Sequence, residues 1–235
     1  MALNTEWLDI DSGNGRFQAY LAAPAAASAP GVVVIQEIFG VNSHIRSVCE
    51  RLAQAGYAAL APDIFWRVRP RIELGYGPDD IAQGRELKAK MKMDEVIEDV
   101  RASFAALAAR PQCRGRKSAI VGYCYGGLVA YVAAARLHPA CASSYYGGGI
   151  VEYLDEADKL DLPMQFHFGA KDAAIPLDQV EKIRAAVANK PAIEVLVYPD
   201  AGHGFHCDQR ASFHAPSAEL AWNRTLALFT RHLAA

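Results

Sequence analysis

Apolar and polar residues alternate along this chain with two different periodicities, one typical of β-strands and one typical of α-helices. Residues 7–10 and 17–22 flank a turn rich in glycine and asparagine, which predicts an antiparallel hairpin. From residue 31 onward, short β-type runs alternate with longer segments in which apolar residues recur at helical spacing. This pattern predicts strands at residues 32–35, 57–61, 117–121, 141–146, 164–168 and 193–198. It predicts helices at residues 43–55, 79–93, 94–109, 127–137, 177–189 and 216–233.

This alternation predicts an α/β fold, a doubly wound and mostly parallel sheet with helices on both faces. The run Val32–Ile35 is apolar throughout, as expected of a strand buried on both faces. Ser43 is the predicted cap of the helix that follows it. Residues 64–80 hold three arginines, two prolines and two glycines and are predicted to form an irregular loop over the sheet. In such a fold, groups that act on a substrate belong at the carboxyl ends of the strands.

Composition narrows the class of protein. A chain of 235 residues that is 52% hydrophobic and 21% charged predicts a single domain over residues 1–235. A net charge of −2 gives no reason to expect a nucleic-acid partner. Residues 1–7 lack the features of a secretory signal, and prolines interrupt the apolar stretch 21–30, so no membrane partner is expected either. Whether the protein is a monomer or a homodimer is left open.

The five cysteines stand at positions 49, 113, 124, 141 and 207. Their number is odd and no Cys-x-x-Cys occurs, which argues against a disulfide framework and against a zinc site. Free thiols without an export signal predict a cytoplasmic protein.

The most informative segment is Gly122-Tyr123-Cys124-Tyr125-Gly126, between a predicted strand and a predicted helix. A strand, a Gly-x-nucleophile-x-Gly turn and a helix form the nucleophile elbow of α/β-hydrolases. Its small residues let the helix and the neighbouring strand approach closely. Here the central residue is cysteine rather than serine. The alternative is a glycine-rich turn that holds a buried structural cysteine.

Two more strand ends carry residues that would complete a catalytic triad. Asp172 follows the strand at 164–168, and His203 follows the strand at 193–198. The order nucleophile, acid, histidine is that of α/β-hydrolases. A thiol has an ordinary pKa of about 8.5, so it needs a base to become a thiolate near neutral pH. An imidazole can act as that base, and a carboxylate orients the imidazole. Taken singly, Asp172 could instead cap a helix and His203 could be a turn residue.

The chain resembles the dienelactone hydrolases (carboxymethylenebutenolidases) over most of its length. The resemblance rests on Gln36–Asn42, Gly56–Ala59 with Ala61–Asp63, Gly122–Gly127, Tyr145–Gly147 and Ala201–Phe205. It implies an α/β-hydrolase fold without a large cap domain and hydrolysis of a small lactone or ester through a thioacyl enzyme. It implies no metal and no organic cofactor.

The resemblance also implies roles for individual residues. Cys124, His203 and Asp172 would form the triad, and Glu37 would contact the resting thiol. The backbone N–H groups of Ile38 and Tyr125 would form the oxyanion hole. Tyr145 corresponds to a family residue near the nucleophile. For Glu37, the alternative is a loop carboxylate paired with a nearby arginine.

One part of the family pattern is missing. Characterised members bind a substrate carboxylate with two arginines, one of them four residues after the catalytic histidine, where this chain has Cys207. Arg210 and Arg85 are the candidates for the two roles. The rival interpretation is a non-hydrolytic protein of the same fold that binds a small molecule or senses oxidants through Cys124. The presence of Asp172 and His203 argues against it, because binding alone needs no base.

Overall fold

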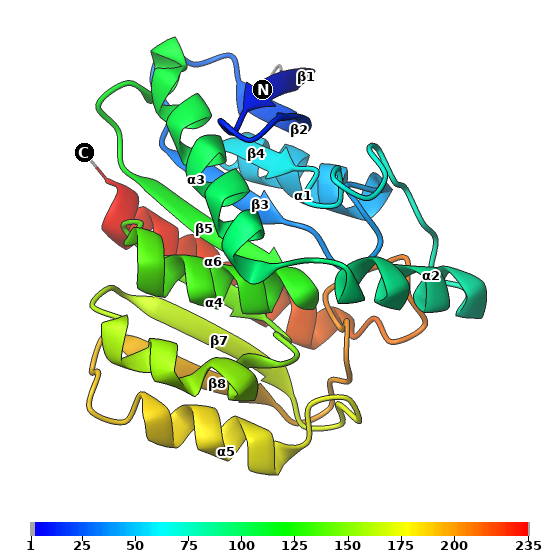
Figure 1. The fold of residues 1–235 in the computed structure, drawn as a ribbon. Coiled ribbons are helices and arrows are strands. Elements are labelled where there is room, and N and C mark those ends of the chain that lie inside the picture. The colour runs from blue at the N-terminus through cyan, green and yellow to red at the C-terminus, as the bar shows by residue number, and fades with distance from the viewer. Residues whose placement is uncertain (1–2, 235) are drawn as a thin grey trace. The chain divides into compact units, whose positions relative to one another are not determined.

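The computed structural model describes residues 3–234 and divides into two compact units, residues 3–119 and 120–234 (Figure 1). Met1 and Ala2, which begin the segment judged not to be a secretory signal, lie outside the described residues. The prediction of a single domain over residues 1–235 stays a prediction. Within residues 3–234, none of the helices is long and apolar enough to cross a lipid bilayer.

The first unit contains most of the predicted elements of the amino-terminal half. They are β1 (Leu3–Asp11), β2 (Arg16–Pro24), β3 (Gly31–Ile35), α1 (Ser43–Gln54), β4 (Ala58–Pro62), α2 (Pro78–Ala89), α3 (Met93–Ala109) and the 3₁₀ turn η1 (Pro111–Cys113). The predicted hairpin is confirmed, because β1 and β2 pair antiparallel from Leu3↔Pro24 to Asp11↔Arg16. Strand β4 pairs antiparallel with β2 and parallel with β3.

In the second unit, all the strands of the sheet run parallel to one another. Its elements are β5 (Ser118–Tyr123, which begins two residues before the unit boundary), α4 (Tyr125–Leu137), β6 (Ala142–Tyr145), the 3₁₀ segment η2 (Ile150–Lys159), β7 (Met164–Gly169), α5 (Leu177–Ala186), β8 (Ile193–Tyr198) and α6 (Ala215–Leu233). Strands β5, β6, β7 and β8 pair in that order, all in parallel. Their carboxyl ends therefore lie along one edge of the sheet.

Helices cover both faces of this parallel sheet, as the sequence predicts. Adjacent residues of a strand point to opposite faces. The Ser144 hydroxyl donates to the carbonyl oxygen of Gly127 on α4 at 2.9 Å, whereas the Ser143 hydroxyl bonds to Thr225 on α6 at 3.0 Å. Helices α4 and α6 thus pack against opposite faces.

The first helix is capped by a different residue from the predicted one. The side chain of Asn42, not that of Ser43, accepts a hydrogen bond from the backbone N–H of Ile45 at 3.3 Å. Asparagine caps as well as serine does. The Asn42 amide also donates to Leu74 O at 3.2 Å, which fixes its side chain at this position.

The irregular segment before α2 is tied to α3 by a buried carboxylate. Asp99 on α3 accepts a hydrogen bond from Trp66 Nε1 at 2.9 Å and a bidentate pair from the Arg67 guanidinium. Burial raises the pKa of Asp99, and the bonds from Arg67 and Trp66 oppose that effect. The prediction of irregular structure is confirmed for residues 64–77, and α2 begins at Pro78.

Candidate active site

Cys124 occupies the turn between β5 and α4, and its backbone is strained. Its φ is 55° and its ψ is −114°, a conformation that residues with a Cβ rarely adopt. The Cys124 N–H donates to Tyr145 O at 3.0 Å, and its carbonyl accepts from Gly127 N at 2.9 Å. Bonds on both sides of the residue hold the turn in this form.

The glycines around Cys124 are required by close backbone contacts. A Cβ at Gly122 would lie 1.8 Å from the carbonyl oxygen of Gly126. A Cβ at Gly127 would lie 2.6 Å from Tyr145 O and 2.8 Å from the Cα of Gly147. The Gly-x-Cys-x-Gly sequence therefore has the strand–turn–helix geometry of an elbow.

Asp172 lies just beyond β7, with its side chain fully buried. Its Oδ1 accepts hydrogen bonds from the N–H groups of Ala174 at 2.8 Å and Ile175 at 3.0 Å. Its Oδ2 lies 2.8 Å from Nδ1 of His203. The alternative of a helix cap is wrong, because α5 (Leu177–Ala186) begins after Pro176 and has no side-chain cap. One oxygen of Asp172 instead stabilises the turn that follows β7, while the other meets the histidine.

His203 lies after β8 and links the other two residues. Its Nε2 is 3.1 Å from the Sγ of Cys124. The edge of its ring meets Tyr146 at a centroid distance of 5.2 Å and an interplanar angle of 60°. The side chain of His203 is 22% exposed. The structure thus brings the three predicted triad residues together in one hydrogen-bonded chain.

The electrostatics of this chain favour a charged imidazole. Burial alone would lower the pKa of His203, but the negative charge on Cys124 and the hydrogen bonds to Asp172 and Cys124 outweigh it and raise the pKa to about 10. Asp172 thus stabilises the protonated histidine. A protonated imidazole at this position can donate a proton to a leaving group.

Tyr125 is the first residue of α4, where backbone N–H groups have no partner within the helix. The partial positive charge of a helix amino terminus favours an anion at this place. A developing oxyanion would therefore be stabilised there.

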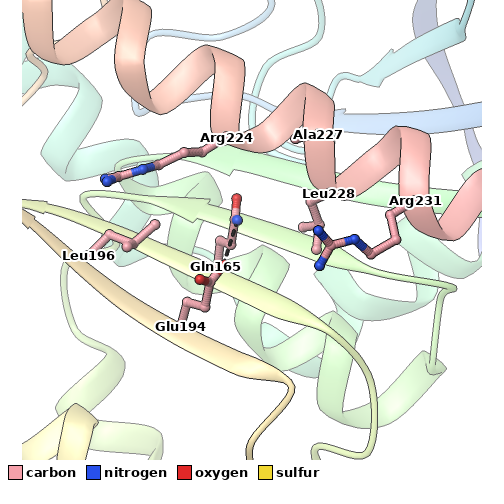
Figure 2. Close-up of a pocket in the computed structure, with 7 residues that line it drawn as sticks. All are labelled: Gln165, Glu194, Leu196, Arg224, Ala227, Leu228 and Arg231. Atoms are coloured by element: carbon pink, nitrogen blue, oxygen red, sulfur yellow. Dashed lines mark hydrogen bonds between the residues drawn. The ribbon is translucent and has the colours of Figure 1, made fainter.

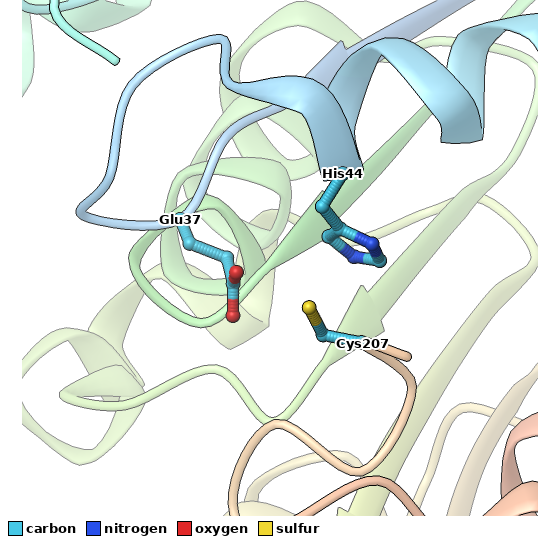
Figure 3. Close-up of side chains that lie close together, drawn as sticks. All are labelled: Glu37, His44 and Cys207. Carbon is cyan, nitrogen blue, oxygen red and sulfur yellow. The ribbon is translucent and has the colours of Figure 1, made fainter. Parts of the chain in front are cut away.

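In the first unit, Glu37 is buried on the loop after β3, and His44 is buried in the first turn of α1 (Figure 3). The hydroxyl of Tyr76 donates to Glu37 Oε2 at 3.4 Å. Ile38 is also buried, and Gly84 of α2 packs on it so closely that a Cβ there would lie 2.6 Å from Ile38 O. Arg85, the next residue, is exposed on α2.

Arg210 lies close to the histidine loop. A Cβ at Gly204, the neighbour of His203, would be 2.4 Å from Nη1 of Arg210, so the guanidinium packs on the Gly204 backbone. Cys207, drawn in Figure 3, is fully buried in the same loop. Its side chain occupies closed space, whereas Arg210 places a cation beside the residue that follows His203.

Tyr145 is fully buried, and its hydroxyl bonds to Thr225 Oγ1 at 2.8 Å, on the α6 face. It contributes its backbone carbonyl to Cys124 N. Sequence reasoning missed its neighbour Tyr146, which is fully buried with a φ of 37° and lies against His203. The available signal was the run Tyr145–Gly147, one of the segments that carry the family resemblance.

Comparison with known proteins agrees with this geometry. The model of the dienelactone hydrolase family matches residues 17–233. A carboxymethylenebutenolidase of Pseudomonas sp. strain P51 is 37% identical over 230 residues, which cover 97% of this chain and 95% of that protein. A provisionally assigned dienelactone hydrolase of Klebsiella pneumoniae has a solved structure with a TM-score of 0.87 and 37% identity, covering 98% of this chain and 100% of that one.

The same fold extends to more distant structures. A dienelactone hydrolase-like promiscuous phosphotriesterase from metagenomic libraries shares the fold at a TM-score of 0.85 and 22% identity, with both chains covered completely. Members of this family match the present chain in both sequence and structure over nearly its full length, and this match assigns the family. This chain belongs to the dienelactone hydrolase family and is a carboxylic ester hydrolase with the α/β-hydrolase fold.

Proposed function

We propose that this hydrolase opens a small lactone or ester through a covalent thioacyl enzyme formed on Cys124. The observation that carries the proposal is the chain from Asp172 Oδ2 through His203 to Cys124 Sγ, with separations of 2.8 Å and 3.1 Å. Nucleophile, base and orienting carboxylate at such distances are the arrangement that acyl transfer requires.

The reaction has two halves. When substrate arrives, His203 takes the proton of the Cys124 thiol and the resulting thiolate attacks the ester carbonyl carbon. The C–O bond to the leaving alkoxide then breaks, and the imidazolium of His203 protonates that alkoxide. Neutral His203 then takes a proton from water, the resulting hydroxide attacks the thioester, and Cys124 leaves as thiolate. Asp172 stabilises the protonated histidine each time it forms. The N–H of Tyr125 at the start of α4, and the N–H of Ile38 that the family resemblance implies, would bind the oxyanion.

The family resemblance also gives Glu37 a role, that of holding Cys124 as a neutral thiol until substrate arrives. A carboxylate beside a thiol disfavours the thiolate. Iodoacetamide should then alkylate Cys124 faster in Glu37→Gln than in the parent protein at neutral pH, as read by mass spectrometry at Cys124. Equal alkylation rates from pH 5 to pH 9 would exclude this role.

For substrate recognition, Arg210 is the proposed anchor of a substrate carboxylate, supported by its packing on Gly204 beside His203. Arg85 is the second proposed anchor, and Tyr145 acts through the carbonyl that holds Cys124 N. Cys207, at the position of the family arginine, is fully buried. A screen of lactones should compare carboxylate-bearing and uncharged substrates in Arg210→Gln and in the parent protein. A selective rise in KM for the carboxylate-bearing ones is expected.

Replacement of the triad residues tests the mechanism. Cys124→Ala and His203→Ala should each reduce kcat for p-nitrophenyl acetate by several orders of magnitude, with non-additive effects in the double variant. Asp172→Asn should cost less. A burst of one p-nitrophenolate per enzyme without turnover would instead favour a binding or oxidant-sensing protein. Undiminished turnover in Cys124→Ala would reject the mechanism.

A cytoplasmic location belongs to the same proposal. All five cysteines carry free thiols in the structure, which suits a reducing compartment.

A further inference from the structure

A cavity opens in the carboxyl-terminal unit, on the face of the sheet that α6 covers. Its volume is about 240 Å³. Figure 2 shows it between α6 and strands β7 and β8. The lining residues are Gln165, Glu194, Leu196, Arg224, Ala227, Leu228 and Arg231. None of these residues belongs to the Cys124–His203–Asp172 chain.

Two cations border the cavity. Arg224 and Arg231 lie on α6, seven residues and about two helical turns apart, so they share one face of the helix. Arg224 donates to the hydroxyl of Tyr198 at 3.3 Å. Among residues 3–234, no carboxylate pairs with the guanidinium of Arg231. The side chain of Arg231 is therefore available to an anion from outside.

The third feature is an acceptor without a donor. Gln165 is 6% exposed, and its side chain rises from β7 toward α6 (Figure 2). Its Nε2 donates to Glu194 Oε2 at 2.7 Å, which fixes the orientation of the amide. Its Oε1 accepts no hydrogen bond from any described residue. A buried polar atom left in this state is costly, and a donor brought by a ligand would remove that cost.

We propose that this cavity binds a small hydroxycarboxylate. The carboxylate pairs with the guanidinium of Arg231, in the bidentate geometry that this group favours. A hydroxyl of the same molecule donates to Gln165 Oε1. The charged lining residues are two arginines and one glutamate, a net charge of +1, so a monoanion is better matched than a phosphate dianion. The apolar side chains of Leu196 and Leu228 leave room for a short carbon chain.

The test compares two ligands that differ by one hydroxyl, 3-hydroxybutyrate and butyrate. Binding is followed by NMR titration of the full-length protein, at the side-chain amide resonances of Gln165. The expected result is that 3-hydroxybutyrate binds about tenfold more tightly than butyrate, because only it satisfies Oε1. Equal affinities would overturn the role of Gln165.

Two variants and one control locate the site. Arg231→Gln should weaken 3-hydroxybutyrate about tenfold to a hundredfold, since it removes a charged hydrogen-bond donor. Arg101→Gln removes an exposed arginine of α3 and should leave the affinity unchanged. Gln165→Leu should bind both ligands equally. Because Arg231 is exposed, its replacement spares the core, and parent-like binding by Arg231→Gln would overturn the proposal outright.

Discussion

Cys124 carries its thiol on a backbone that glycine would adopt more easily. A φ of 55° in a residue with a Cβ costs free energy of order 1–3 kcal/mol. The bonds to Tyr145 and Gly127 hold this conformation in place. Its consequence is that the sulfur stands at the end of β5, where His203 meets it.

The strain predicts an inverted order of stability for two inactive variants. The free energy of unfolding of Cys124→Gly should be about 1 kcal/mol higher than that of Cys124→Ala, because glycine adopts a positive φ without strain. The comparison is made by urea denaturation. At the exposed helical position Glu86 the order should be the ordinary one, with alanine more stable than glycine by about 1 kcal/mol. A Cys124→Gly protein less stable than Cys124→Ala would contradict the strain.

The protonation state of His203 is a second property of a single residue. The pKa of His203, raised to about 10, depends on the charge of Cys124 and on Asp172. NMR titration of its imidazole should give a lower pKa in Cys124→Ala and also in Asp172→Asn. In the parent, protonated His203 adds stability that is complete below its unfolded pKa of about 6.5. That contribution is lost as pH rises toward 10. An unchanged imidazole pKa in both variants would contradict this account.

At the scale of elements, one hydroxyl of α6 bonds to side chains of two strands, β6 and β7. Thr225 Oγ1 lies 3.0 Å from Ser143 Oγ, 2.8 Å from Tyr145 Oη and 3.3 Å from His167 Nε2. His167 Nδ1 continues the network to Tyr198 Oη at 2.8 Å. Strands β6, β7 and β8 are thus linked through side chains as well as through backbone pairing.

Removal of the Thr225 hydroxyl should lower the free energy of unfolding, because three buried polar groups share this one partner. Thr225→Val keeps the shape of the side chain but leaves three buried polar groups short of a partner, with an expected loss of about 1–3 kcal/mol in unfolding free energy. Ser28→Ala, at an exposed hydroxyl outside this network, is the control and should change stability by under about 0.5 kcal/mol. Equal losses in the two variants would mean that the network contributes nothing.

The predicted elements and the network differ in how far they could be read from the sequence. Strands such as β3 were predictable because β-branched runs are local signals. The elbow was predictable because Gly-x-Cys-x-Gly between a strand and a helix is a local motif. The hydrogen-bond partners of Thr225 lie 58 to 82 residues away in the sequence, and no local sequence pattern predicts such a contact. The sequence analysis did not predict segment η2, whose 3₁₀ turns are interrupted by non-helical backbone at Tyr153.

At the scale of the whole molecule, a buried neutral histidine makes stability depend on pH. His167 is fully buried within the network of Thr225 and Tyr198. Burial, together with the positive charge of Arg224, lowers the pKa of His167 to about 3. The unfolded chain binds a proton at this residue below a pH of about 6.5, whereas the folded chain does not. Stability from this group is therefore complete above pH 6.5 and falls as the solution is acidified toward pH 3.

The size of this effect can be measured by difference. One proton bound only by the unfolded chain corresponds to a slope of about 1.4 kcal/mol per pH unit. Replacement of His167 by glutamine keeps a hydrogen-bonding side chain without a group that titrates. The difference in unfolding free energy between the parent and His167→Gln should therefore narrow from pH 6.5 to pH 4, measured by urea denaturation. His138→Gln, at an exposed histidine, is the control for loss of a histidine and should not produce this narrowing. If the parent and His167→Gln curves run parallel across that range, the neutral buried imidazole is not a source of acid sensitivity, and the carboxylates of the chain account for all of it.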